Sequence, residues 1–247
     1  ETQPAAGSIT TSGQVGYLPQ DPRGVDLTVT ARDRILSARG LDDIVRKLRE
    51  SELAMATATG EKQDKAMRRY GRLEGEFVAA GGYAAESEAA SIAGALGLDE
   101  RILGQTLGTL SGGQRRRIEL ARILFSGAET LLLDEPTNHL DADSIAWLRD
   151  HLKGYKGGLV VISHDVDLLD AVVNKVFHLD ANRAELDQYN LGWRAYLQQR
   201  ETDERRRKRE RANAEKKASV LMAQADKMRA KATKTVAAQN MARRAER

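Results

Sequence analysis

Two short stretches of the chain carry residue types that suit the binding and transfer of phosphate. The stretch Ser111–Gln114 stands where a helix should begin, because a serine followed three residues later by a glutamine has the spacing of a capping box. The two glycines between them leave backbone amides uncovered at the positive end of that helix, where anions bind. The carboxylate pair Asp134 and Glu135 follows a short apolar run. An anion site together with two adjacent carboxylates indicates phosphoryl chemistry with magnesium.

A helix and two strands must position these groups. We expect the helix to reach about Phe125 and to stop at Gly127. The apolar run Thr130–Leu133 predicts a buried parallel strand that presents the two acids at its carboxyl-terminal end. A second buried strand is expected at 158–162, and His164 follows it. Because ligands bind at the carboxyl-terminal edge of parallel sheets, we interpret His164 as a functional residue.

These residues also carry a family resemblance. The stretch Leu110–Gln114 resembles the signature of ABC ATPases, and Leu131–Glu135 resembles their Walker B strand. Asn138–Asp141 stands where that family has its D-loop. The residues of these motifs are similar to those of the ABC-F class, which consists of soluble twin-ATPase proteins of the ribosome. The resemblance implies ATP as the substrate and Mg²⁺ as its metal ion.

The resemblance further implies a role for each matching residue. Asp134 would hold Mg²⁺, and Gln20, as the glutamine of the Q-loop, would complete the same coordination shell. Glu135 would orient and deprotonate the attacking water, and His164 would contact the γ-phosphate. The residues that would bind ATP are Gln20, Ser111, Gly112, Gly113, Gln114 and Asp141.

The predicted fold class is α/β, an ABC-type ATPase core with a helical subdomain, followed by a long basic α-helical hairpin. We expect a partial ATPase domain over residues 1–192, with the helical subdomain at about 29–127, and a truncated interdomain linker over 193–247. Helices are expected near 30–39, 41–57, 62–79, 84–96 and 165–171, a further helix from Asp141 to Gly154, and strands near 174–179 and 184–189. No long insertion interrupts the subdomain, so a large ribosome-contacting arm is not expected there.

Basic residues are concentrated towards the end of the chain. From Arg194 onward there are 17 Lys and Arg against 7 Asp and Glu, a net charge of +10, whereas residues 1–193 carry a net −7. This asymmetry predicts a nucleic-acid partner for the tail alone. A helix without glycine or proline is expected to about Ala232, then a bend at 233–235 and a return helix from Val236. The residues expected to contact RNA are Arg205, Arg206, Arg207, Lys208 and Arg209.

In ABC-F proteins the position of this tail is the interdomain linker, a helical hairpin that enters the ribosome near bound tRNA. The implied partners are therefore the ribosome, through rRNA and bound tRNA, and a second ATPase domain of the same protein. No Gly-x-x-x-x-Gly-Lys-Ser/Thr occurs in the sequence, so the phosphate-binding loop that the family has ahead of Gln20 is absent. The chain is expected to supply half of each of two composite ATP sites and, by itself, to be inactive.

Composition excludes several other kinds of site. The chain has no cysteine, which rules out disulfides and thiolate metal sites. Its four histidines lie more than ten residues apart, without the i, i+4 spacing of a helical metal site. No apolar run approaches the ~20 residues of a membrane span, and no signal peptide is visible. We therefore expect a soluble, cytoplasmic protein without a membrane partner.

Two other functions stay open. The chain could be the ATPase subunit of a membrane transporter. The basic helix and the residue sequence Asn138–Asp141 oppose this interpretation. It could also be a non-catalytic RNA-binding fragment, which the missing phosphate-binding loop favours. The interpretation that the residues favour is an ATP-hydrolysing ABC-F protein that binds the ribosome and acts on translation, as a translation factor or in ribosome protection against antibiotics.

Overall fold

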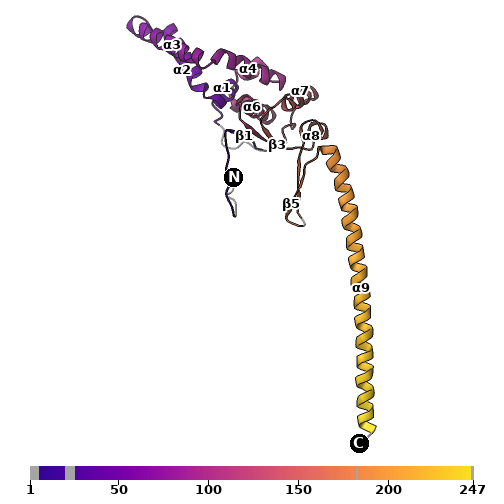
Figure 1. The fold of residues 1–247 in the computed structure, drawn as a ribbon. Coiled ribbons are helices and arrows are strands. Elements are labelled where there is room, and N and C mark those ends of the chain that lie inside the picture. Colours follow the sequence, from indigo (N-terminus) through magenta and orange to yellow (C-terminus); the bar gives the residue numbers. More distant parts are fainter. Residues whose placement is uncertain (1–5, 20–25, 182, 246–247) are drawn as a thin grey trace. The chain divides into compact units, whose positions relative to one another are not determined.

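The computed structural model describes the backbone of residues 6–19, 26–181 and 183–245, and within these ranges the side chains up to residue 223 and that of Lys227. The chain divides into two compact units, residues 1–172 and 173–247. Figure 1 labels their helices and strands. The predicted α/β class is confirmed, because helices separate the strands of a parallel sheet along the first unit.

A three-stranded parallel sheet lies at the centre of the first unit. Its strands are β1 (Val15–Leu18), β2 (Thr130–Asp134) and β3 (Gly158–Ile162), in the order β1-β2-β3. In this register Leu133 lies beside Leu18 on one strand and beside Val161 on the other. All three strands therefore end at one edge, as the sequence predicted for β2 and β3.

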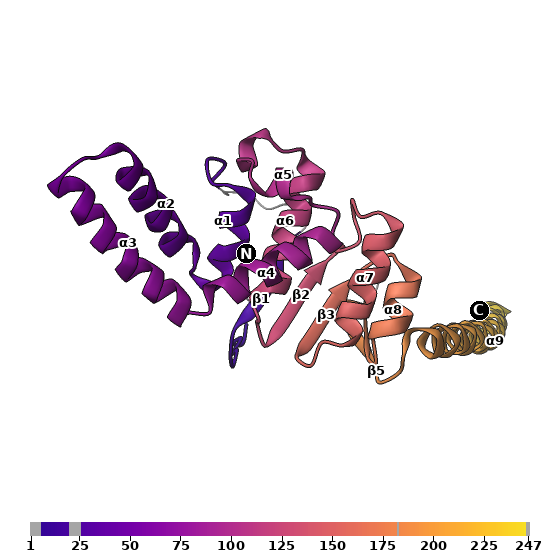
Figure 2. The same cartoon turned by 90° about the horizontal axis from the view of Figure 1, so that it is seen from above.

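Helices of the first unit cover one face of this sheet (Figure 2). Leu18, Leu131 and Leu133 point into that covered face and are buried in the main apolar cluster. The alternate positions face outward, and Val160 and Ile162 are 49% and 61% exposed. The prediction of a buried strand at 158–162 is therefore wrong for the face that carries Val160 and Ile162, because an apolar run does not show on which sides of a sheet helices pack.

The four helices expected between residues 30 and 96 form close to their predicted positions in the predicted helical subdomain. It contains α1 (Ala31–Leu36) with a 3-10 turn (Ser37–Arg39), α2 (Asp42–Thr57), α3 (Glu61–Ala79), α4 (Gly82–Ala95), α5 (Glu100–Leu103) and a second 3-10 turn (Leu107–Thr109). Helices α2 and α3 pack along one another as a hairpin (Figure 2). Polar side chains begin two of the shorter helices: Thr30 accepts a hydrogen bond from the amide of Asp33, and Asp99 accepts one from the amide of Ile102.

Helix α6 (Gly112–Phe125) connects this subdomain to the sheet. Its apolar residues include Ile118, Ala121, Leu124 and Phe125, which are all buried. The helix packs against β1, α1 and α4. After β2, helix α7 (Ala142–Lys153) ends before Gly154 as predicted, and it packs against α8 (Val166–Val172), which follows β3.

One buried ion pair lies between α6 and α1. Glu119 of α6 is buried, and its carboxylate accepts hydrogen bonds from Arg34 of α1 at 2.5 and 3.1 Å. A third bond, at 2.8 Å, comes from Arg122 one turn further along α6. A buried carboxylate persists only when it is paired in this way. These contacts therefore fix how α1 lies against α6.

The second unit is a β-hairpin followed by one long helix. Strands β4 (Val176–Asp180) and β5 (Glu185–Tyr189) pair antiparallel, and α9 runs from Trp193 to Ala245. The two strands, which we expected in the ATPase domain, thus belong to the same compact unit as α9.

The predicted helical hairpin is not confirmed. Helix α9 continues without interruption through residues 233–235, so the predicted bend there is wrong, and Val236 continues the same helix instead of starting a return helix. The physical reason is that threonine costs only a few tenths of a kcal/mol in a helix, roughly 0.5, and no glycine or proline occurs in this segment to break it. Within the described parts of the chain, no helix has the length and apolar character required to cross a membrane.

Candidate functional site

The two predicted carboxylates lie at the end of β2. Asp134 is the last residue of the strand, and Glu135 extends the pairing by one residue, since its amide donates to the carbonyl of Ile162 at 2.8 Å. Glu135 has φ = 48°, in the left-handed region, which costs a residue with a side chain roughly 1–2 kcal/mol. Its own carbonyl accepts from the amide of Asn138 at 3.3 Å and closes a turn. Strain of this kind is characteristic of active sites.

The structure brings Glu135 and His164 together. One carboxylate oxygen of Glu135 lies 3.3 Å from Nε2 of His164, and the other accepts from the His164 amide at 3.4 Å. The carboxylate is 11% exposed and the imidazole is 98% exposed. A nearly buried base is thus held in place from the neighbouring strand, while the imidazole beside it faces solvent. This arrangement can orient a water molecule and take a proton from it.

The start of α6 has the predicted capping box. The Gln114 amide donates to Oγ of Ser111 at 3.2 Å, and Oε1 of Gln114 accepts from the Ser111 amide at 2.9 Å. Ser111 and Gly112 are exposed, and among the residues that the structure describes the amides of Gly112 and Gly113 have no hydrogen-bond acceptor. Because capping uses Oγ only as an acceptor, the Ser111 hydroxyl still has its one hydrogen to donate. Two amides and a hydroxyl donor at a helix start suit a phosphate.

The loop between β2 and α7 lies against the start of α6. A Cβ placed on Gly113 would lie 3.4 Å from Cβ of His139, which has φ = 68°. At the end of this loop Asp141 begins α7 and accepts from the Ser144 amide at 2.8 Å, and the hydrogen bonds from Ser144 hold the pKa of Asp141 below its ordinary value. The side chain of Asp141 is therefore used as a helix cap.

Sequence reasoning missed Arg116 on α6. This residue is only 7% exposed, and its guanidinium donates to two backbone carbonyls, those of Pro19 and Asp134. It therefore joins the ends of β1 and β2 to the helix that carries the Ser111–Gln114 stretch. The available signal was its position four residues before Leu120 and seven before Ile123, which places it on the buried face of the helix.

The five predicted RNA-contacting residues (205–209, here the basic cluster) lie on α9 and differ in their partners. Arg207 lies 3.3 Å from Asp187 of β5 and 3.9 Å from Asp180 of β4, so it joins the helix to the hairpin. Arg205 pairs with Glu201, and Arg206 pairs with Asp203 and Glu210, all on α9 itself. Lys208 and Arg209 are exposed and form no ion pair with the described residues.

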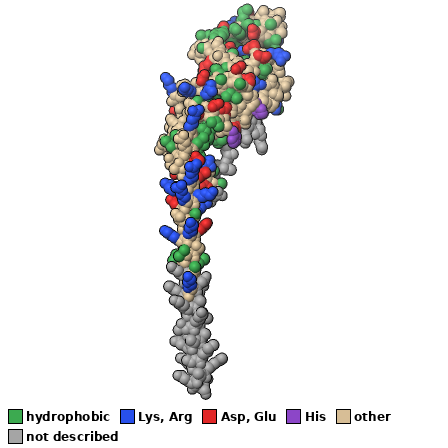
Figure 3. All heavy atoms as spheres, turned by 90° about the vertical axis from the view of Figure 1, so that its right-hand side faces the viewer, with side chains coloured by type: hydrophobic (Ala, Val, Ile, Leu, Met, Phe, Trp, Pro, Cys, Tyr) green, Lys and Arg blue, Asp and Glu red, His purple; other side chains and the backbone are tan. Residues whose placement is uncertain are grey.

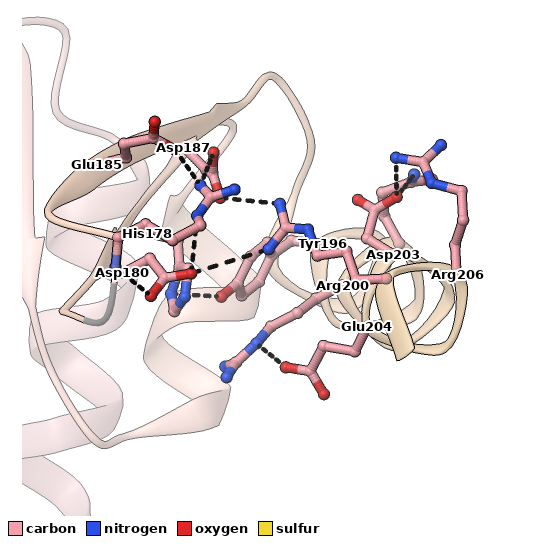
Figure 4. A network of polar contacts seen from close by, with 12 residues as sticks. His178, Asp180, Glu185, Asp187, Tyr196, Arg200, Asp203, Glu204 and Arg206 are labelled. Carbon is pink, nitrogen blue, oxygen red and sulfur yellow. Dashed lines mark hydrogen bonds and ion pairs between the residues drawn. The ribbon is translucent and has the colours of Figure 1, made fainter. Parts of the chain in front are cut away.

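Arg207 belongs to a polar network at the base of α9. Figure 4 labels its partners Asp180 and Asp187 in this network. Arg183 pairs with Asp180, Glu185 and Asp187, and its hydrogen bonds to Asp187 hold the pKa of that carboxyl below its ordinary value. The hydroxyl of Tyr196 lies 3.3 Å from Nδ1 of His178. Hairpin and helix are thus joined by side chains over more than three turns of α9.

Comparison with known proteins shows the family of this chain. A family model for ABC transporters matches residues 1–138, more than half of the chain, and a second ABC transporter model matches residues 179–247. The chain belongs to the ABC transporter family of ATP-binding proteins. In this ABC protein, the first match contains the capping box, Asp134 and Glu135.

Three relatives place the ABC protein more narrowly. The tylosin resistance ATP-binding protein TlrC of Streptomyces fradiae is 37% identical over 214 residues, which are 85% of this chain and 38% of that protein. The energy-dependent translational throttle protein EttA of Mycobacterium tuberculosis is 36% identical over 196 residues, 78% of this chain and 33% of that protein. The probable ATP-binding protein YheS of Escherichia coli K12 is 35% identical over 175 residues, 71% of this chain and 27% of that protein.

These relatives confirm the predicted resemblance to the ABC-F class. The chain spans between about a quarter and two fifths of the length of the relatives just described.

The donors at the end of β2 fit the Mg²⁺ that the ABC family uses with ATP. Asp134 offers hard carboxylate oxygens, and Mg²⁺ binds through one or two carboxylates together with phosphate oxygens and water. The described residues contain no group of three or more His, Cys, Asp or Glu side chains that could hold a metal ion by themselves. Gln20, the other predicted metal ligand, lies outside the described residues.

Proposed function

We propose that this chain is the first ATPase domain and following linker of an ABC-F ATPase that binds the ribosome in the cytoplasm and acts on translation, as a translation factor or in protection against antibiotics. One observation carries the enzymatic part. The Glu135 carboxylate is nearly buried, lies in a strained turn at the carboxyl-terminal edge of a parallel sheet, and is paired with His164. A base held in this way, next to a carboxylate suited to Mg²⁺, is the arrangement needed for nucleotide hydrolysis.

The residues at the sheet edge divide the work. Asp134 would hold Mg²⁺, which when bound supplies positive charge to the β- and γ-phosphates of ATP. Glu135 would orient a water molecule and take its proton. His164, held 3.3 Å from Glu135 but otherwise exposed, would donate to the γ-phosphate from its open side.

The start of α6 would serve a second, composite site. The Ser111 hydroxyl and the amides of Gly112 and Gly113 would donate to the γ-phosphate of ATP held by the other ATPase domain. Gln114 would act on ATP indirectly, because its side chain is engaged in the capping box. Asp141, through its cap on α7, would fix the loop that carries His139 against Gly113.

Ribosome binding is supported by α9 and by the relatives. The helix carries exposed lysine and arginine side chains along its described part, seen as blue groups in Figure 3. Such residues contact RNA phosphates. EttA of Mycobacterium tuberculosis is named a translational throttle, and TlrC of Streptomyces fradiae is named for tylosin resistance. We infer that the target of this chain is the ribosome, with its rRNA and bound tRNA.

The test is Glu135→Gln in the full-length protein, with the equivalent acid of the second domain also changed. Loss of the base should slow steady-state ATP hydrolysis by about 10²- to 10⁴-fold and leave ATP binding intact, so that the protein stays in the ATP-bound state on ribosomes. The matched control is Glu129→Gln, since Glu129 is exposed just before β2, at the opposite end of the strand from Glu135. Hydrolysis within a few-fold of wild type in the double variant would refute the assignment.

A further inference from the structure

Arg116 is a buried cation in a place where an apolar side chain would fit the helix pattern. Its neighbours on the same face of α6, Leu120 and Ile123, are buried apolar residues of the main cluster. Burying a guanidinium is costly unless its donors are satisfied. The chain meets that cost with backbone carbonyls as acceptors, those of Pro19 and Asp134. An apolar side chain at this position would make neither of these two contacts.

The two carbonyls belong to the ends of two strands at the functional edge. Pro19 follows β1 directly, and Asp134 is the last residue of β2. The ladder between these strands ends at the pair Leu18 and Leu133, one residue before each acceptor. Beyond the last pair of the ladder, the planar guanidinium binds both strands through its fixed fork of donors and so sets the spacing between the ends of β1 and β2.

We propose that Arg116 is a positioning residue for the magnesium–nucleotide site. By holding the Asp134 carbonyl it fixes the backbone from which the Asp134 carboxylate would reach Mg²⁺, and by holding the Pro19 carbonyl it fixes the end of β1 at the same edge. This proposal rests on the proposed ATPase function. It goes beyond that function by assigning control of Mg²⁺-dependent binding to a residue that contacts the ends of β1 and β2 through their backbone carbonyls.

The experiment measures equilibrium ATP binding by the full-length protein that already carries Glu135→Gln in its first domain and the equivalent change in the second. Binding of a fluorescent ATP analogue is titrated once with excess Mg²⁺ and once with EDTA. Adding Arg116→Gln should weaken binding in Mg²⁺ by about 10- to 100-fold, the range seen when groups that orient metal ligands are lost, and should leave binding in EDTA within about twofold. The second domain's site supplies an internal reference in the same titration.

The matched control is Arg117→Gln. Arg117 is the next residue of α6 and also donates to backbone carbonyls, those of Leu96 and Gly97, but these lie at the end of α4 and not at the sheet edge. Both variants should lower the thermal midpoint, and only Arg116→Gln should change the ratio of binding with Mg²⁺ to binding with EDTA. Equal weakening in Mg²⁺ and in EDTA would show a structural role only and would overturn the proposal.

Arg116→Lys separates charge from positioning. Lysine keeps the positive charge but presents it as a point and not as a planar fork. Binding in Mg²⁺ should therefore recover only in part, and full recovery would overturn the proposal because charge alone would suffice. If the Glu135→Gln parent bound no ATP at all, the proposed ATPase function would fail before Arg116 was tested, so the two failures are distinguishable.

Discussion

The basic cluster of α9 permits a sharp test, because its five members differ in their surroundings. Arg207 is 34% exposed and is held by Asp187 and Asp180 of the β-hairpin. Lys208 and Arg209, the next two residues, are exposed and without ion pairs in the described structure. We expect the double change Lys208→Gln, Arg209→Gln to remove phosphate contacts, and Arg207→Gln to remove none.

The magnitude follows from counterion release. Each phosphate contact contributes ~0.7 to 0.9 to the slope of log affinity against log salt concentration, so losing two flattens the slope by ~1.4 to 1.8. Between about 50 and about 300 mM salt, the advantage of wild type over the double variant should shrink by a factor of roughly 12 to 25. Arg207→Gln should leave the slope unchanged and instead loosen the hairpin, which hydrogen exchange of β5 amides would detect.

The assay is ribosome co-sedimentation of the full-length protein in its ATP-bound form across this salt range. ATP hydrolysis measured without ribosomes should hardly change in either variant, because the proposed catalytic residues all lie in the first unit and the cluster in the second. If Arg207→Gln flattened the slope as much as the double variant, the assignment of Arg207 to the hairpin would be refuted. If the double variant pelleted as wild type does at every salt concentration, α9 would be a solvated spacer with no phosphate contacts at these residues.

Two further predictions concern stability, measured by urea unfolding with circular dichroism. Glu119→Gln should lower the free energy of unfolding by about 2 kcal/mol, because it leaves Arg34 and Arg122 without the buried carboxylate. Glu88→Gln, in the exposed pair with Arg39, should lower it by less than about 1 kcal/mol. Equal effects of the two variants would contradict the role of burial. Gly97→Ala should destabilise the fold by at least about 1 kcal/mol, because Gly97 has φ = 70° and the new Cβ would lie 2.9 Å from Nη1 of Arg117. Gly94→Ala lies inside α4, where a Cβ meets open space, and should stabilise the fold by up to about 1 kcal/mol. A change of the same sign in both variants would count against this reasoning.

The parts of the structure that sequence predicted are those with a local cause. The capping box at Ser111 and Gln114 needs only its own four residues, and it forms as predicted. Asp141 and Gly154 bound α7 for similarly local reasons. The approach of His164 to Glu135 was predictable at the level of the sheet edge, because parallel strands deliver the residues after them to one side.

The parts that sequence did not predict depend on contacts between distant residues. Nothing in the local sequence shows that Arg116 meets the carbonyls of Pro19 and Asp134, which come from segments far apart in the chain. Arg207 looks like its neighbours in the basic cluster, and only the pairing of β4 with β5 places two carboxylates beside it. The predicted bend at 233–235 failed for a different reason, since threonine is a weak signal and the residues around it favour helix.

Helix α6 offers a way to separate the energetics of the fold from those of the site. Glu119 and Arg116 lie three residues apart on one helix and both are buried. Glu119 meets side chains of α1 and α6, so its loss should change stability and leave the sheet edge in place. Arg116 meets the backbone of that edge, and its loss should change how the edge binds Mg²⁺ with nucleotide. A protein in which both variants gave the same ratio of binding with Mg²⁺ to binding with EDTA would be one in which α6 acts only as a core helix. If instead only the Arg116 variant changed this ratio, the buried guanidinium on α6 would be positioning the sheet edge that binds Mg²⁺.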